Sequence, residues 1–173
     1  STSSYDHNRA VTGFLVVATN ETNYDSVKTT ISDDGTWLVG AATIPYYNAT
    51  TKQGKIAIYK YNDSSETYDL FQTITGDTDS GTGRNTSIFN NGEFIISGAY
   101  RSSKIVFLTY SEDDELFNKT ELTISGATYL GSSLYMTDNN IFAADTTGVH
   151  IYNLFSGSTS DIIMDSEPEP EPE

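Results

Sequence analysis

The chain reads Ser32-Asp-Asp-Gly-Thr-Trp-Leu-Val-Gly-Ala41, continues with Gly54-Lys-Ile-Ala-Ile-Tyr-Lys-Tyr61, and then reads Tyr68-Asp-Leu-Phe-Gln-Thr-Ile-Thr-Gly-Asp77. Each run is short, contains β-branched or aromatic residues, and is bounded by Gly, Asn, Asp or Ser, which is typical of β-strands separated by turns. The Asp-Gly pair in the first run favours the positive φ angles of a tight hairpin. This stretch therefore predicts one antiparallel sheet of short strands.

The same unit recurs twice along the chain. The matching positions Gly54, Ser103 and Gly148 lie 49 and 45 residues apart, a period that fits four short strands with their turns. A single four-stranded sheet cannot bury both of its faces, so the copies must stack on one another. The second copy comprises Phe89–Ala99, Ser103–Tyr110 and Leu116–Gly126, and the third comprises Thr137–Asp145 and Gly148–Tyr152, with Asp161–Met164 as a candidate last strand.

These runs resemble the FG-GAP-type β-propeller repeats of integrin α-subunits and of many secreted eukaryotic proteins. The resemblance covers about 25–155 and implies an all-β fold of about three four-stranded antiparallel blades plus an extra N-terminal strand. Closed propellers usually have about four to eight blades. Three copies therefore form a short open stack, close a ring with copies from another chain, or belong to a longer protein.

The sequence divides into three parts. Residues 1–23 form an N-terminal segment whose strand Val11–Ala18 either closes the ring within the chain or adds to the exposed edge of another subunit. Residues 24–165 form the repeat domain, and residues 166–173 form an acidic Pro-Glu tail of extended character. The start at Ser1 without Met suggests a processed or trimmed chain.

Composition excludes several classes of function. The 173 residues include 9 Lys and Arg against 24 Asp and Glu, and the net charge of −15 argues against nucleic-acid or anionic-membrane partners. No stretch approaches the 18 or so apolar residues that a membrane span needs. Cysteine is absent, which excludes disulfides, thiol nucleophiles and cysteine-based metal sites.

Five Asn-x-Ser/Thr sequons predict attached N-glycans and an extracellular or cell-surface location. The alternative is that these Asn and Thr residues serve as turn and strand-edge residues. The sequons lie at Asn20, Asn48, Asn62, Asn85 and Asn118.

No residue pattern predicts catalysis. His7 lies in a polar stretch, whereas His150 alternates with apolar residues in a predicted strand and is expected to be structural. The acidic groups at Asp33-Asp34 and at 112–115 fall in predicted turns, where solvated carboxylates are the default. We therefore expect no enzyme activity and no catalytic, cofactor-binding or metal-binding residues.

Calcium is the cofactor alternative that the resemblance raises. Integrin-like repeats often carry an Asp-rich loop, and Asp77-Thr-Asp79-Ser-Gly81 alternates acids before a glycine. The second copy has Ser125-Gly126 at the matching place, so an ordinary polar turn is the expected structure.

Tyrosines have two predicted roles. Tyr59, Tyr110 and Tyr152 recur at the same repeat position, at the ends of strands, and are expected to pack. Tyr46, Tyr47 and Tyr100 follow the Gly-Ala runs and are candidates for a contact surface.

The sequence thus predicts a non-enzymatic extracellular structural glycoprotein, a self-assembling subunit of a fibre or surface coat with copies of itself as partners. The alternative is an adhesion or ligand-binding propeller module that recognises a protein or carbohydrate through loops 46–51 and 100–103. An enzyme built on a propeller is the third hypothesis, without a motif that names its reaction.

Overall fold

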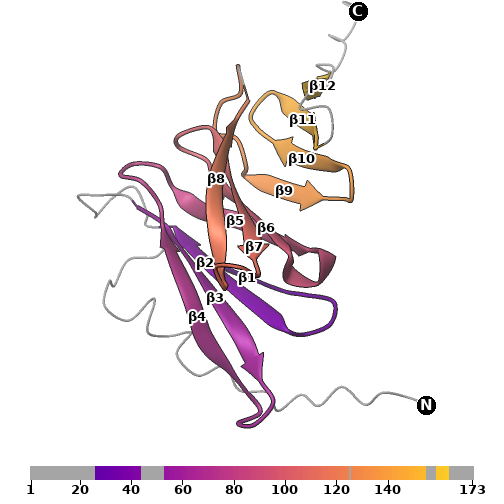
Figure 1. The fold of residues 1–173 in the computed structure, drawn as a ribbon. Coiled ribbons are helices and arrows are strands. Elements are labelled where there is room, and N and C mark those ends of the chain that lie inside the picture. Colours follow the sequence, from indigo (N-terminus) through magenta and orange to yellow (C-terminus); the bar gives the residue numbers. More distant parts are fainter. Residues whose placement is uncertain (1–25, 44–52, 125, 155–158, 164–173) are drawn as a thin grey trace, which may run out of the picture.

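The computed structural model describes residues 26–43, 53–124, 126–154 and 159–163 (Figure 1). In these residues the chain is built from β-strands, with one 3-10 turn at Asn90–Gly92. The strands are β1 (Ser26–Ile31), β2 (Trp37–Thr43), β3 (Lys55–Asn62), β4 (Thr67–Thr75), β5 (Thr82–Phe89), β6 (Phe94–Ala99), β7 (Lys104–Ser111), β8 (Leu116–Thr123), β9 (Ser133–Met136), β10 (Asn140–Ala144), β11 (Gly148–Asn153) and β12 (Thr159–Ile163).

The described strands form three antiparallel sheets of four strands each. Strand order follows the chain, with β1 to β4 in blade 1, β5 to β8 in blade 2 and β9 to β12 in blade 3. Strand β5 contacts β1 and β2, and β9 contacts β5 and β6, so the first strand of each blade packs against the blade before it (Figure 1). This is how the blades of a β-propeller stack. The prediction of an all-β fold with three four-stranded antiparallel blades is confirmed.

Each blade has a forward face, toward the next blade in chain order, and a backward face. Side chains alternate between the two faces along each strand. Val39 and Ile58 pair in register on the forward face of blade 1 and are fully buried against blade 2. Trp37, on the same face, has ring centroids of Phe71 and Phe117 5.0 and 5.1 Å away. A cluster of aromatic rings therefore forms one part of this interface, and aliphatic side chains form the rest.

Blade 2 presents its forward face to blade 3 in the same way. Ile96 and Phe107 pair in register at the position that Val39 and Ile58 occupy in blade 1. They belong to a second hydrophobic cluster, with Leu130, Leu134, Met136 and Ile141 among its buried members. Two cores therefore lie between the sheets, one at each blade interface.

The third copy matches the others at this position too. Phe142 pairs in register with Ile151 on the forward face of blade 3, while Ile141 and Ala143 point back toward blade 2. One central pair of apolar residues thus recurs on the forward face of every blade.

Strand register corrects two equivalences that the sequence repeats suggest. Gly40 pairs with Ala57 on the backward face, whereas Gly98 pairs with Ile105 on the forward face. Gly98 is therefore equivalent to Ala41, because each lies six residues after the turn glycine of its copy, Gly92 and Gly35. Aligning Gly98 with Gly40 shifts the strand by one residue and moves its side chains to the opposite face.

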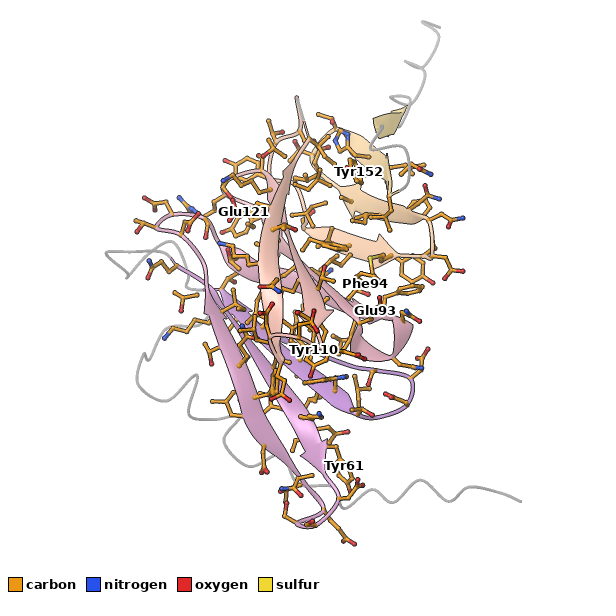
Figure 2. All side chains as sticks on the ribbon, in the orientation of Figure 1. Tyr61, Glu93, Phe94, Tyr110, Glu121 and Tyr152 are labelled. Atoms are coloured by element: carbon orange, nitrogen blue, oxygen red, sulfur yellow. The ribbon has the colours of Figure 1, made fainter. Side chains whose placement is uncertain are left out.

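The strand register also changes which tyrosines are equivalent between blades 1 and 2. Tyr110 pairs with Phe117 just as Tyr61 pairs with Tyr68, so Tyr110 matches Tyr61 and not Tyr59. Its packing role is as predicted, because Tyr110 lies 5.4 Å from the Trp37 ring at the junction of blades 1 and 2 (Figure 2). Tyr59 is fully buried.

The described part of the chain contains no helix with the length and apolar character needed to cross a membrane.

Several predicted features lie outside the described residues. They are the strand Val11–Ala18, the tail 166–173, His7, Asn20, Tyr46, Tyr47 and Asn48.

Candidate binding site at the loop end of the blades

Four connections meet at one end of the blades and are joined by hydrogen bonds. The backbone N–H of Arg101, between β6 and β7, donates to the carbonyl of Ser80, between β4 and β5, at 3.1 Å. The N–H of Tyr129, between β8 and β9, donates to Ser103 Oγ at 3.1 Å. These contacts fix the loops against one another. We call this end of the blades the loop face. It comprises Arg84, Tyr100, Arg101, Ser103, Thr128 and Tyr129, with Ser80 and the Asp145 side chain buried beneath them.

A cation and two aromatic rings form the centre of the loop face. Arg84 lies near the start of β5, the first strand of blade 2, and its guanidinium carbon is 5.4 Å from the centroid of the Tyr100 ring. The Tyr100 and Tyr129 rings stack with centroids 6.3 Å apart and planes 29° apart. Tyr129 is 58% exposed, so the stack is open to solvent. A cation over a tyrosine face is an attractive arrangement.

Gly81 allows the Tyr100 ring to take this position. Its φ is +62°, in the region that favours glycine, and a Cβ on it would lie 2.5 Å from Tyr100 Cε1. A side chain at residue 81 would therefore push the ring away from Arg84.

Arg84 carries a charge that the described residues do not neutralise. No described carboxylate forms an ion pair with it, whereas Lys104 and Lys119 both pair with Glu121, at 2.7 and 2.8 Å, on the outer strand of blade 2 (Figure 2). The two lysines hold the pKa of Glu121 low, and Lys119 also lies 3.8 Å from Asp77 Oδ1, so each lysine has a carboxylate partner. Among the described residues Arg84 is thus a cation without a carboxylate partner, on a chain with a net charge of −15.

Asp145 holds the blade 3 side of the loop face together. Its Oδ1 accepts hydrogen bonds from the N–H groups of Thr147 and Gly148, at 2.6 and 3.0 Å, and its Oδ2 accepts one from the N–H of Thr128 at 3.0 Å. Burial raises the pKa of Asp145, but the His150 side chain and these donors outweigh that effect and hold the pKa well below its usual value. The carboxylate is therefore charged and structural.

His150 completes this arrangement. Its Nε2 lies 2.9 Å from Asp145 Oδ2, and the residue is only 6% exposed. Because His150 is buried and paired with Asp145, it helps to order the β10–β11 turn. This arrangement fits the structural role predicted for His150.

The acidic turns fit the predicted solvated carboxylates. Asp77 and Asp79 are exposed, and Asp34 accepts hydrogen bonds from Ser32 Oγ and the Thr36 N–H at 2.6 and 3.0 Å, which lowers its pKa within the β1–β2 turn. Within the described ranges, no three His, Asp or Glu side chains gather as metal ligands.

Three of the five sequons lie in described strands. Asn62 and Asn118 lie on β3 and β8, where their Nδ2 atoms donate to Asp69 and Asp114 at 2.8 and 3.2 Å. Asn85 lies on the inner strand β5 and is half-buried, and its Nδ2 is 3.5 Å from the Ser132 carbonyl of blade 3. Its nitrogen thus faces a neighbouring blade, which suits glycan attachment poorly, while Asn62 and Asn118 keep theirs at the outer part of the blades.

No known protein family and no curated protein sequence matches this chain. Solved β-propeller structures do match its fold. A protein from Lactobacillus plantarum aligns with a TM-score of 0.55 at 12% identity, and a candidate 6-phosphogluconolactonase from Bacteroides fragilis aligns with 0.53 at 13%. These alignments cover 79% and 80% of this chain, respectively, and 40% of each matched chain. The periplasmic gluconolactonase of Pseudomonas aeruginosa gives 0.52 at 14%, covering 77% of this chain and 38% of its own.

These comparisons define the class of fold, a β-propeller blade array of the kind that gluconolactonases use. The chain spans about 40% of the length of the first of these structures. At 12–14% identity the likeness is one of fold alone.

The comparisons also correct the predicted function. We expected a self-assembling structural glycoprotein of a fibre or coat, with an adhesion module as the alternative. The similar structures are instead proteins named as lactonases, so that prediction, which relied on the integrin-like appearance of the repeats, is wrong. The repeats in the sequence indicate how the strands are spaced. Because several classes of propeller share this spacing, it does not determine the function.

Proposed function

We propose that the loop face binds a small anionic sugar derivative and that the chain belongs to a lactonase-type propeller. The observation that carries the proposal is the Arg84 guanidinium, which lies over the Tyr100 ring without a carboxylate partner among the described residues. The names of the similar structures supply the substrate class, a sugar lactone and the acid that it yields.

The chemistry of the loop face suits such a ligand. Arg presents a planar fork of donors that matches a carboxylate or phosphate group. The exposed Tyr129 ring, stacked on Tyr100, offers an apolar face and a hydroxyl group for a sugar ring. In a largely acidic protein, a local positive charge also attracts the anion to this end of the blades.

Lactone hydrolysis would use the same charge. Water adds to the lactone carbonyl carbon and the ring C–O bond breaks. The products are a hydroxyl group and a carboxylic acid, which releases its proton to the solvent and becomes a carboxylate. Negative charge therefore builds on the carbonyl oxygen, where a positioned cation stabilises the transition state. Arg84 is the described residue placed to supply that stabilisation.

Two measurements test the proposal. Binding of gluconate and 6-phosphogluconate is followed by calorimetry, and hydrolysis of glucono-δ-lactone is compared with the spontaneous rate in buffer. Arg84→Gln should weaken binding of the acids by about tenfold or more, as expected for a lost charged hydrogen bond. Lys60→Gln removes the same charge on β3, next to Trp37, and should leave binding unchanged.

The outcomes separate binding from catalysis. Equal binding by the parent protein and Arg84→Gln overturns the assignment of the site. Acid binding that depends on Arg84, together with hydrolysis no faster than in buffer, overturns the lactonase activity and keeps the binding site.

A further inference from the structure

Tyr129 has a backbone conformation that tyrosine rarely adopts. Its φ is +57°, in the left-handed region that favours glycine. Among the described residues, it is the only aromatic residue with a positive φ. A bulky side chain in this region strains the backbone, and a strained residue persists only where the surrounding structure holds it in place.

Blades 2 and 3 hold the backbone of Tyr129 in this conformation. The next residue, Leu130, is fully buried in the core between the two blades. The N–H of Thr128 donates a hydrogen bond to Asp145 Oδ2, on blade 3, at 3.0 Å. The N–H of Tyr129 donates to Ser103 Oγ, in the β6–β7 turn of blade 2, at 3.1 Å. The fold therefore imposes the position of Tyr129.

Burial of the Tyr129 ring does not explain this strain. The side chain is 58% exposed and stacks on Tyr100 at the surface. By contrast, Tyr59 and Tyr68, which pack within blade 1, are buried, and neither has a positive φ. A tyrosine thus occupies a position that suits glycine while most of its side chain stays in solvent. Such an arrangement is typical of a residue that serves a binding site rather than a core.

We infer that Tyr129 is a specificity-determining residue of the loop face, held in place by the fold so that its ring stacks on the ring of a cyclic sugar. This inference rests on the proposed function, in which Arg84 binds the anionic group of the same ligand. A sugar ring presents a fixed face of C–H groups to an aromatic ring, whereas an open-chain polyol does not. The site should therefore prefer a cyclic anionic sugar to its open-chain counterpart.

A matched pair of ligands measures the preference for a ring. Glucose 6-phosphate is cyclic, whereas sorbitol 6-phosphate is an open chain with the same carbon skeleton and the same phosphate group. Calorimetry should show that the parent protein binds the cyclic ligand about fivefold more tightly. Tyr129→Gly should abolish this preference, and Tyr129→Phe, which keeps the aromatic ring, should retain it.

Stability distinguishes a binding role from a packing role. Tyr129→Gly relieves the backbone strain, so its urea midpoint should lie at or above that of the parent protein. Glu66 is the matched control, because it is exposed, has a φ of +54° and lies in the β3–β4 turn, at the other end of blade 1 from the loop face. Glu66→Gly should also keep or raise the midpoint, and it should leave the ligand preference unchanged.

The outcomes separate this inference from the proposed function. A Tyr129→Gly midpoint below that of the parent protein means that the ring stabilises the fold, and this result overturns the inference. Equal affinity of the parent protein for the two phosphates, or a preference that persists in Tyr129→Gly, overturns it as well. In those cases the proposed site still stands if Arg84→Gln weakens binding of both phosphates. Failure of the parent protein to bind either phosphate overturns the proposed site and the role of Tyr129 together.

Discussion

The interface between blades 1 and 2 and the interface between blades 2 and 3 use the same sheet positions but different side chains. The first gathers rings around Trp37, with Phe71, Tyr110 and Phe117 within 5.0 to 5.4 Å. The second is mostly aliphatic and brings two backbones together, since a Cβ on Gly98 would lie 2.2 Å from the Gly131 carbonyl oxygen.

This difference shows how a repeat can diverge in sequence and keep its architecture. The position of the apolar pair decides which face is buried. Glycine lets two backbones approach at both interfaces, Gly54 against Thr82 at the first and Gly98 against Gly131 at the second, whereas the cluster of rings around Trp37 belongs to the first. The third copy therefore looks weak in sequence and still packs.

Removing the ring at the centre of the first interface should have the largest effect. Trp37→Ala leaves a cavity among three aromatic rings and should lower the free energy of unfolding by about 3–5 kcal/mol. Urea unfolding followed by circular dichroism measures this loss. Leu70→Ala, at an exposed position, should change stability by less than about 0.5 kcal/mol. Similar losses in the two variants would mean that the rings do not form a core.

Adding one methyl group at the second interface should have the next largest effect. Gly98→Ala places a Cβ against the backbone of Gly131 and should cost about 1–3 kcal/mol through overpacking. Hydrogen exchange should show the loss of protection concentrated in β9 and β10, and β2 and β3 should keep theirs. Uniform loss across all three blades would contradict separate interfaces.

Acid should weaken the second interface through Asp145. Its pKa in the folded chain is lowered, so its contribution to stability is present above the unfolded value near 3.9 and is lost as pH falls through the folded value. Asp145→Asn should cost about 1–3 kcal/mol at neutral pH and flatten the dependence of stability on pH below about 4. Urea titrations between pH 7 and pH 3 measure both effects, and an unchanged slope in the variant would contradict the assignment.

A single hydrogen bond within blade 1 should matter least. The Tyr68 hydroxyl donates to the Gly35 carbonyl at 2.6 Å, and it ties β4 to the β1–β2 turn. Tyr68→Phe should cost about 0.5–1.5 kcal/mol, measured by urea unfolding. A loss as large as that of Trp37→Ala would mean that the turns, and not the blade interfaces, dominate stability.

The second and third strands of each blade could be predicted from the sequence, because they are buried and rich in β-branched residues. The predicted run Phe89–Ala99, for example, contains the whole of β6, Phe94–Ala99. The first strands β1, β5 and β9 were not identified, since runs such as Ser-Val-Lys-Thr-Thr-Ile are short and polar. These strands are stabilised by packing against neighbouring blades, and a local sequence pattern contains no information about such contacts.

The candidate site was predicted only in part for the same reason. Tyr100 was identified as a contact residue from its place after the Gly-Ala run. Arg84 was missed because it lies on an unrecognised strand, where only the scarcity of basic residues in the chain could have drawn notice to it. Tyr129 joins Tyr100 through the fold, across 29 residues of sequence.

The most direct test of the stacked blades is a nuclear Overhauser experiment between the α-protons of Gly98 and Gly131. These residues lie in different sheets, and a Cβ on Gly131 would stand 2.6 Å from Gly98 Cα. We expect a strong cross-peak, because protons on two backbones so close together relax each other efficiently. Absence of the cross-peak, with both residues assigned in a folded protein, would contradict the packing of blade 3 on blade 2.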